Sequence, residues 1–350
     1  MGGGLTPAQA NARAALTALL EPILADRHPD AAEPPLFLVA CSGGADSLAL
    51  ASTAAFLQKK LGFRAGAIVI DHQLQEATAA VADRTAATLR ALGLAPVLQQ
   101  QVEITQAGAG VEAAARAARY AAFEKAVEQT GATGVLLGHT KDDQAEQVLL
   151  GLVRGSGTRS LAGMPPQRGH YYRPFLKVSR AETEQICTKE SLTWWEDPTN
   201  ADPAYLRSRI RTHVLPELVD LLGDQLGENL ARTAEICRQD ADIIDSLAQE
   251  RFATLANVQP QKVELDMTDL KAEPAGLRAR LFAMAAHQLG AEALTHERTG
   301  AIEQLLAGSK SAGPVQLPGG VEVWRGQRTP GVRRQNPAKY GKLVFITVRS

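Results

Sequence analysis

The sequence has few cysteines, few aromatic residues and no long apolar run. Its 350 residues include 3 cysteines (Cys41, Cys187 and Cys237), which lie far apart without a C-x-x-C pair, so a local zinc or iron–sulfur motif is not expected. No apolar stretch is long enough to predict a transmembrane helix. A basic segment followed by an apolar one is also missing near the N-terminus, so no signal peptide is expected. Together these absences predict a cytoplasmic protein with no membrane partner.

The chain also has no excess of either charge. Its formal net charge is −1, with 45% hydrophobic and 21% charged residues. This composition is ordinary for a globular protein, and the length allows two domains. Any affinity for nucleic acid must therefore depend on local patches of charge.

Between residues 36 and 154 the sequence alternates regularly between apolar runs and helical patterns. Strands are predicted at 36–41, 65–72, 95–103 and 134–139, and helices at 6–24, before Gly62, before Gly93, at 110–131 and at 143–154. This alternation predicts an α/β fold with a doubly wound, mainly parallel sheet. Ligands of such sheets bind beyond the carboxyl ends of the strands.

The alternation stops after Arg154. Residues 154–180 are rich in Gly and Pro and are predicted to form loops, helical periodicity dominates from about 215 to 307, and the last residues alternate like β-strands. We therefore predict an N-terminal catalytic domain over residues 1–215. A mostly helical domain with a short β-like C-terminal segment is predicted over residues 216–350.

The segment S-G-G-A-D-S, residues 42–47, lies between the first predicted strand and a helix. Its glycines allow backbone N–H groups to converge on an anion, and the helix N-terminus adds its dipole. Ser42 and Ser47 can donate hydrogen bonds to the same anion, and Asp46 could hold Mg²⁺ carried by phosphates. No Gly-Lys-Ser/Thr follows, so this is not a Walker A loop. The alternative is a tight turn in which Ser42 and Asp46 cap the helix.

The segment G-H-T-K-D-D-Q-A-E-Q, residues 138–147, follows another predicted strand and places three acids close together. Asp142 and Asp143 lie four and three positions before Glu146, so all three approach one helical face. Carboxylates this close repel one another unless a metal ion or a substrate ammonium group lies between them. The alternative is that acids simply favour the first turn of a helix.

Positive charge is concentrated in three places. Glu112, Arg116 and Arg119 form a stripe on the helix at 110–131, where ordinary solvated ion pairs are the slightly better explanation, and Tyr120 and Phe123 are expected in the core. Residues 154–180 contain six Lys/Arg and no acid, with Tyr171 and Tyr172 as candidate stacking surfaces. The segment from Val323 onward contains seven Lys/Arg and no acid. Such patches predict a polyanionic partner such as a single-stranded RNA loop, although a solvated basic loop is the alternative.

Taken in order, these motifs closely resemble those of the tRNA(Ile)-lysidine synthase family, within the N-type ATP pyrophosphatase (PP-loop) superfamily. The resemblance covers residues 36–218 through the segments SGGADS, IVIDHQLQ, EAAARAARY, GHTKDDQAE, RGSGTRSLAGM and WWEDPTN followed by LRSRIR. It implies that ATP adenylates the C2 oxygen of the wobble cytidine in a CAU-anticodon tRNA(Ile). L-lysine then displaces AMP to form lysidine, which changes codon reading from AUG to AUA.

The resemblance also implies residue roles. ATP and Mg²⁺ are expected at Ser42, Gly43, Gly44, Ala45, Asp46 and Ser47, with Asp46 as the metal's carboxylate and Asp71, His72 and His139 bordering the nucleotide. Asp143 and Glu146 are expected to bind lysine and, with Arg119 and Asp46, to form the catalytic set. The residues expected to bind tRNA, with the second domain, are Arg154, Ser156, Arg159, Arg173, Arg207, Arg209 and Arg211. A homodimer is suggested by analogy with the family.

Three alternatives remain open at this point. A tRNA thiolase of the same superfamily would need cysteines near the pocket, and here only Cys41 adjoins the loop. A small-molecule ligase such as NAD or GMP synthetase would leave the basic patches unexplained. An ATP-regulated RNA-binding protein without catalysis would not need the acidic cluster.

Overall fold

The computed structural model describes residues 4–26, 33–71, 76–102, 111–155, 157–197, 205–308, 313–326 and 341–348. The chain divides into two compact units, Met1–Arg238 and Gln239–Ser350. No helix in these described ranges is long and apolar enough to cross a membrane.

The division between the units falls inside helix α10 (Leu226–Leu255), further along the chain than the predicted boundary after residue 215. The first turns of α10 pack on the first unit, which accounts for this difference. Ala234 is fully buried beside Gly163, and Arg238 donates a hydrogen bond to the carbonyl oxygen of Ala162.

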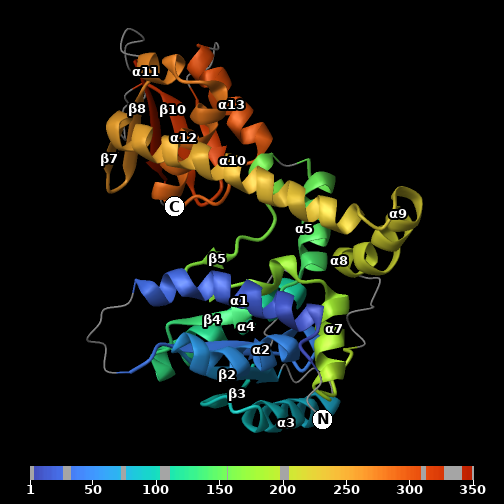
Figure 1. The fold of residues 1–350 in the computed structure, drawn as a ribbon. Helices are drawn as coiled ribbons and strands as arrows, with labels where there is room; N and C mark the ends of the chain where they lie inside the picture. The colour runs from blue at the N-terminus through green and yellow to red at the C-terminus, as the bar shows by residue number, and fades with distance from the viewer. Residues whose placement is uncertain are drawn as a thin grey trace. The chain divides into compact units, whose positions relative to one another are not determined.

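The first unit is built on a six-stranded sheet in the order β3-β2-β1-β4-β6-β5 (Figure 1). Its strands are β1 (Leu36–Cys41), β2 (Arg64–Asp71), β3 (Val97–Gln101), β4 (Gly134–Leu137), β5 (Gln167–Arg168) and β6 (Tyr171–Tyr172). All pairings are parallel except that of β5 with β6. The chain runs outward from β1 to β3 on one side and returns with β4 on the other. Strand order therefore reverses between β1 and β4, which is where such sheets bind ligands.

Helices cover both faces of this sheet, as the sequence predicts. The helices of this part of the chain are α1 (Pro7–Ala25), α2 (Ala45–Leu61), α3 (Glu76–Ala91), α4 (Val111–Thr130), α5 (Lys141–Val153), the single turn α6 (Thr158–Leu161) and α7 (Arg180–Lys189). Phe37 and Val39 of β1 pack with α1, α2, α3 and α7, whereas Leu36 and Leu38 pack with α4. The alternation along β1 thus places one residue set in each of two apolar layers.

The segment predicted as loop after Arg154 contains regular structure. It forms the helical turn α6, the β5–β6 hairpin and a 3₁₀ turn (η1, Pro174–Lys177), and helix α7 begins at its last residue, Arg180. Tyr171 and Tyr172 do not offer stacking surfaces, which corrects that expectation. Both are buried, and the hydroxyl of Tyr171 donates to Glu124 at 2.6 Å. Short strands of two residues carry no periodicity by which a sequence could reveal them.

The first unit continues with α8 (Leu206–Arg209), the wider turn η3 (Ile210–Val214) and α9 (Leu215–Leu222), and it ends with the first part of α10.

The second unit contains the rest of α10, a five-stranded sheet in the order β7-β8-β11-β10-β9, and three helices. Its elements are β7 (Ala256–Gln259), β8 (Lys262–Asp266), α11 (Met267–Ala272), α12 (Ala275–Gln288), α13 (His296–Ala307), β9 (Val315–Leu317), β10 (Val321–Arg325) and β11 (Lys342–Thr347). The sheet is antiparallel throughout and larger than predicted, because β7 and β8 lie within the range where helical periodicity dominates.

Candidate active site

The loop between β1 and α2 forms a tight turn at the N-terminus of a helix. Gly43 has a φ of +84°, which favours glycine, and a Cβ there would lie 2.6 Å from Oγ1 of Thr85. The hydroxyl of Ser47 donates to the carbonyl oxygen of Gly44 at 2.9 Å and accepts from the backbone N–H of Ser42 at 3.2 Å. Ala45 begins α2, so the predicted loop opens onto the N-terminus of a helix.

The segment after β4 brings its acids to the same edge of the sheet. Thr140 caps α5, and its backbone N–H donates to Asp143 at 2.8 Å. Gly138 allows close approach, since a Cβ there would lie 3.2 Å from backbone atoms of Asp46 and Ser47. The two motifs, far apart in the sequence, are therefore in direct contact.

The three acids of α5 have different surroundings. Asp143 and Glu146 are buried, with side chains 9% and 1% exposed. Asp142 instead accepts a hydrogen bond from the backbone N–H of Arg180 at 2.8 Å, which caps α7. Of the predicted cluster, only Asp143 and Glu146 therefore form the acidic pair.

Two arginines neutralise the acidic pair. Arg207 donates to Glu146 at 2.8 Å and to Asp143 at 3.1 Å. Arg211 donates to Glu146 at 2.6 and 3.1 Å and to Asp143 at 2.9 Å. These residues were expected to bind tRNA, whereas the structure places their guanidinium groups on the acids. The sequence predicts a metal ion or a substrate ammonium group beside these acids, whereas in this structure the cations beside them belong to the chain itself.

A cavity of about 370 Å³ extends from the loop to Asp143, one of the two acids of the pair. Its wall includes Asp46 and Ser47 from the loop, His139 and Asp143 from the second motif, and apolar residues of β1 and β2. Cationic and aromatic side chains also line it, namely Arg116, Arg119, Tyr120, Phe123, Arg180, Trp195 and Arg211. A cavity with apolar walls and clustered charges of both signs suits a nucleotide and an amine together.

Burial and charge shift the pKa values of several of these groups. Burial raises the pKa of Asp46, although hydrogen bonding from Thr183 and the charge of Arg180 oppose it. Burial would also raise the pKa of Asp143, but Arg207 and the backbone N–H of Thr140 hold it below its usual value. Burial lowers the pKa of His139 to about 4, so this imidazole is neutral at neutral pH. The pKa of Arg119 is lowered by burial and by Arg116.

The remaining predicted site residues have different positions. Asp71 ends β2 and is buried but is not part of the cavity wall. Arg154, Arg159 and Arg209 are exposed. Arg173 is 5% exposed and donates to the carbonyl oxygen of Pro165 at 3.0 Å, so its expected contact with tRNA is not available in this structure. His72 and Ser156 lie outside the described residues.

Sequence reasoning gave no role in the site to Arg180, Thr183 or Trp195. The structure places Arg180 and Thr183 beside Asp46, and the backbone N–H of Trp195 donates to the carbonyl oxygen of Gly43 at 2.9 Å. The sequence did contain one signal for the helix that carries Arg180 and Thr183, because Ser179 and Glu182 form a capping box at the start of α7.

The cysteines do not form a cluster site. Cys41 and Cys187 are buried, and Cys237 is partly buried. Burial raises the pKa of Cys41, and burial and nearby Asp46 raise that of Cys187 to about 12. No group of three or more His, Cys, Asp or Glu that could hold a metal occurs in the described part of the chain.

The parallel sheet and the loop after its first strand are features of the PP-loop class of proteins, and the comparisons with known proteins agree with this assignment. A family model described as the PP-loop domain matches residues 11–218, and one described as the TilS substrate binding domain matches residues 265–334. The structure is similar to that of U34-tRNA thiolase NcsA from Methanococcus maripaludis with its [4Fe-4S] cluster. That match has a TM-score of 0.50 and 15% sequence identity, and covers 65% of this chain and 78% of that chain. It supports the PP-loop fold alone.

Sequence relatives narrow the class. The chain is 48% identical over 285 residues to tRNA(Ile)-lysidine synthase of Leifsonia xyli subsp. xyli, covering 81% of this chain and 86% of the relative. It is 47% identical over 305 residues to that of Streptomyces coelicolor, covering 86% of each. It is also 47% identical over 298 residues to that of Thermobifida fusca, covering 85% of this chain and 90% of the relative. The chain belongs to the tRNA(Ile)-lysidine synthase family.

Proposed function

We propose that this chain is an ATP-dependent ligase that forms lysidine in a CAU-anticodon tRNA(Ile). The C2 oxygen of the wobble cytidine attacks the α-phosphorus of ATP, and pyrophosphate leaves. The ε-amine of L-lysine then attacks C2, the bond between C2 and the adenylated oxygen breaks, and AMP leaves. The observation that carries this proposal is the buried acidic pair, which holds two guanidinium groups and whose Asp143 shares a cavity with the loop between β1 and α2.

The acidic pair supports a cationic amino acid as the second substrate. An ammonium group of lysine would replace one guanidinium group on Asp143 and Glu146, keeping both buried carboxylates neutralised. Arg207 and Arg211 would have to move for this exchange. The exposed Arg209 lies on α8 with Arg207, directly before the turn η3 that contains Arg211, so a bound polyanion would draw this segment toward itself.

The phosphate side of the reaction depends on the loop and on cavity cations. Ser42, Gly43, Gly44, Ala45 and Ser47 would hold the phosphates through N–H and hydroxyl donors, and Arg119 of the cavity wall would add charge. Asp46 fits Mg²⁺, because this ion is usually held in nucleotide sites by one or two carboxylates and the substrate's own phosphates. When bound, Mg²⁺ would neutralise the charge that builds up on the departing pyrophosphate.

Exposed arginines and the second unit are proposed to contact the tRNA. Arg154, Arg159 and Arg209 offer cations at the surface, and Ser156 lies between the first two in sequence. A homodimer and a cytoplasmic location are also part of this proposal, by analogy with the family.

One assay tests the proposal directly. The full chain is incubated with Mg-ATP, radiolabelled lysine and unmodified tRNA transcripts, and label in the tRNA is measured. We expect label only in the CAU-anticodon tRNA(Ile), with a tRNA(Met) transcript of the same anticodon as the matched control. Consumption of ATP without transfer of lysine would contradict the proposal.

A further inference from the structure

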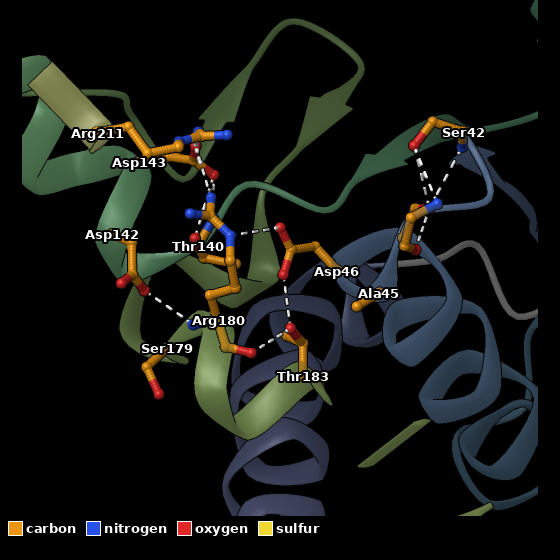
Figure 2. A network of polar contacts seen from close by, with 12 residues as sticks. Ser42, Ala45, Asp46, Thr140, Asp142, Asp143, Ser179, Arg180, Thr183 and Arg211 are labelled. Carbon is orange, nitrogen blue, oxygen red and sulfur yellow. Dashed lines mark hydrogen bonds and ion pairs between the residues drawn. The ribbon is translucent and has the colours of Figure 1, made fainter. Parts of the chain in front are cut away.

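Arg180 lies between the two halves of the site. Its Nε is 3.5 Å from Oδ2 of Asp46 in the loop, and one of its terminal nitrogens is 3.6 Å from Oδ1 of Asp143 in the acidic pair (Figure 2). The side chain is 27% exposed and belongs to the cavity wall. It is therefore a single cation shared between the part of the site that faces phosphate and the part that faces the amine.

The backbone of Arg180 is fixed more firmly than its side chain. Its N–H donates to Asp142 at 2.8 Å, and its carbonyl oxygen accepts from Thr183 at 2.7 Å (Figure 2). The hydroxyl of Thr183 also lies 2.5 Å from Oδ1 of Asp46. The start of α7 is thus tied to the first turns of both α5 and α2.

The contacts of the Arg180 guanidinium group are long by comparison with its neighbours. Arg207 and Arg211 reach the acidic pair at 2.6 to 3.1 Å, which are good charge-assisted hydrogen bonds. At 3.5 and 3.6 Å, Arg180 makes only ion pairs. Of these three arginines, it therefore loses least by exchanging its partners for another anion.

A triphosphate in the loop would be such an anion. Guanidinium groups bind phosphate oxygens through two parallel hydrogen bonds, a geometry that Arg180 has with neither carboxylate here. If Arg180 turned to phosphate, Asp143 would lose one of its three neighbouring cations. A buried carboxylate that loses a cation gains affinity for another, and the substrate amine can supply it.

We propose that Arg180 is a positioning residue that couples the two substrates, so that nucleotide in the loop strengthens binding of lysine to the acidic pair. This inference rests on the proposed function. Because coupling of this kind is reciprocal, lysine must strengthen nucleotide binding by the same factor.

Equilibrium dialysis of radiolabelled lysine tests the coupling without turnover. Lysine affinity of the full chain is measured with tRNA(Ile) transcript, in the presence and absence of Mg²⁺ and α,β-methylene-ATP, which cannot be cleaved between its α and β phosphates. For the wild type we expect the analogue to tighten lysine binding on the order of tenfold. In Arg180→Ala this ratio should fall close to one, and in Arg180→Lys part of it should return.

Lys177→Ala is the matched control. Lys177 is an exposed cation three residues before Arg180, and it pairs with Glu235 and not with the acids of the site. It should keep the wild-type ratio, and unfolding midpoints of all variants establish that they are folded. An Arg180→Ala ratio equal to that of the wild type, or a wild-type ratio of one, would overturn the coupling. If the wild type transfers lysine to tRNA in the assay above but shows no coupling, only this inference fails. If it transfers none, the proposed function fails.

Discussion

At the scale of single residues, neighbouring side chains of one type do different work. Asp142 caps a helix while Asp143, the next residue, faces a cavity. Arg173 supports a carbonyl group from a buried position while Arg209 is exposed. Residue type and spacing predicted which side chains gather, but the direction of each depends on helices that the sequence places far away.

Glu146→Gln should separate lysine transfer from activation of the tRNA. The amide keeps the shape but removes the charge that offsets Arg207 and Arg211, so an ammonium group would bind poorly. We expect kcat/KM for lysine to fall at least ~100-fold, while ATP-dependent adenylation of tRNA in the absence of lysine is retained.

Glu235→Gln is the control for this variant, since Glu235 pairs with the exposed Lys177 away from the cavity. An equal loss of adenylation in Glu146→Gln would place Glu146 in the first chemical step instead.

His139 should make stability depend on pH. Its pKa is about 4 in the folded chain, against 6.5 for an ordinary histidine. Below pH 6.5 the unfolded chain binds this proton while the folded chain does not, so stability falls as pH falls toward 4. Between pH 7 and pH 5 the free energy of unfolding should drop by about 2 kcal/mol from this group.

Chemical denaturation of the wild type and His139→Gln at both pH values measures this contribution. The variant should lose less stability than the wild type over the interval. Identical losses would mean that His139 does not titrate in this way.

At the scale of elements, the active site depends on helices that start close together. The first turns of α2, α5 and α7 meet around Asp46, Asp143 and Arg180 (Figure 2). Gly138 allows the first two to approach, because only hydrogen occupies the space next to the backbone of α2.

Gly138→Ala should therefore impair nucleotide binding. A Cβ at 3.2 Å from backbone atoms of Asp46 and Ser47 would push α2 away from β4, at a cost of about 1 to 3 kcal/mol. We expect KM for ATP to rise about tenfold with a smaller change in KM for lysine. Gly227→Ala in α10 has open space around its Cβ and serves as the control. Unchanged kinetics in Gly138→Ala would show that the contact does not constrain the loop.

The sequence predicted the elements whose patterns are long. Strands β1 to β4 and helices α1 to α5 appear where apolar runs and helical periodicity placed them. The β5–β6 hairpin was missed because its strands have two residues each. The ion pairs of Arg207 with Glu146 join residues 61 apart in sequence, and no local pattern contains that information. The partners of Arg180, Asp46 and Asp143, are also far from it in sequence, so only the three-dimensional structure reveals these contacts.

At the scale of the whole molecule, a chain of nearly neutral charge must bind a polyanion through a few exposed cations. Each phosphate neutralised by a cation releases counterions, so the affinity for tRNA should fall with salt. Arg209→Ala should reduce the slope of log K against log salt by about 0.7 to 0.9. Filter binding with tRNA(Ile) transcript over a range of salt concentrations measures the slope.

Arg173→Ala provides the contrast. Because Arg173 is 5% exposed, its loss should lower the unfolding midpoint and leave the salt slope unchanged. A reduced slope for Arg173→Ala, or an unchanged one for Arg209→Ala, would reverse this assignment of the two arginines.

The hydrogen bond from Trp195 to Gly43 joins two backbone groups. Its strength is therefore independent of the side chain at position 195, and natural substitution there can vary the cavity wall without releasing the loop. Only proline lacks the N–H donor. Trp195→Pro should thus raise KM for ATP well above that of Trp195→Ala, although both lose the indole ring. Steady-state kinetics of the two variants would measure how much this backbone hydrogen bond contributes to the loop conformation that binds ATP.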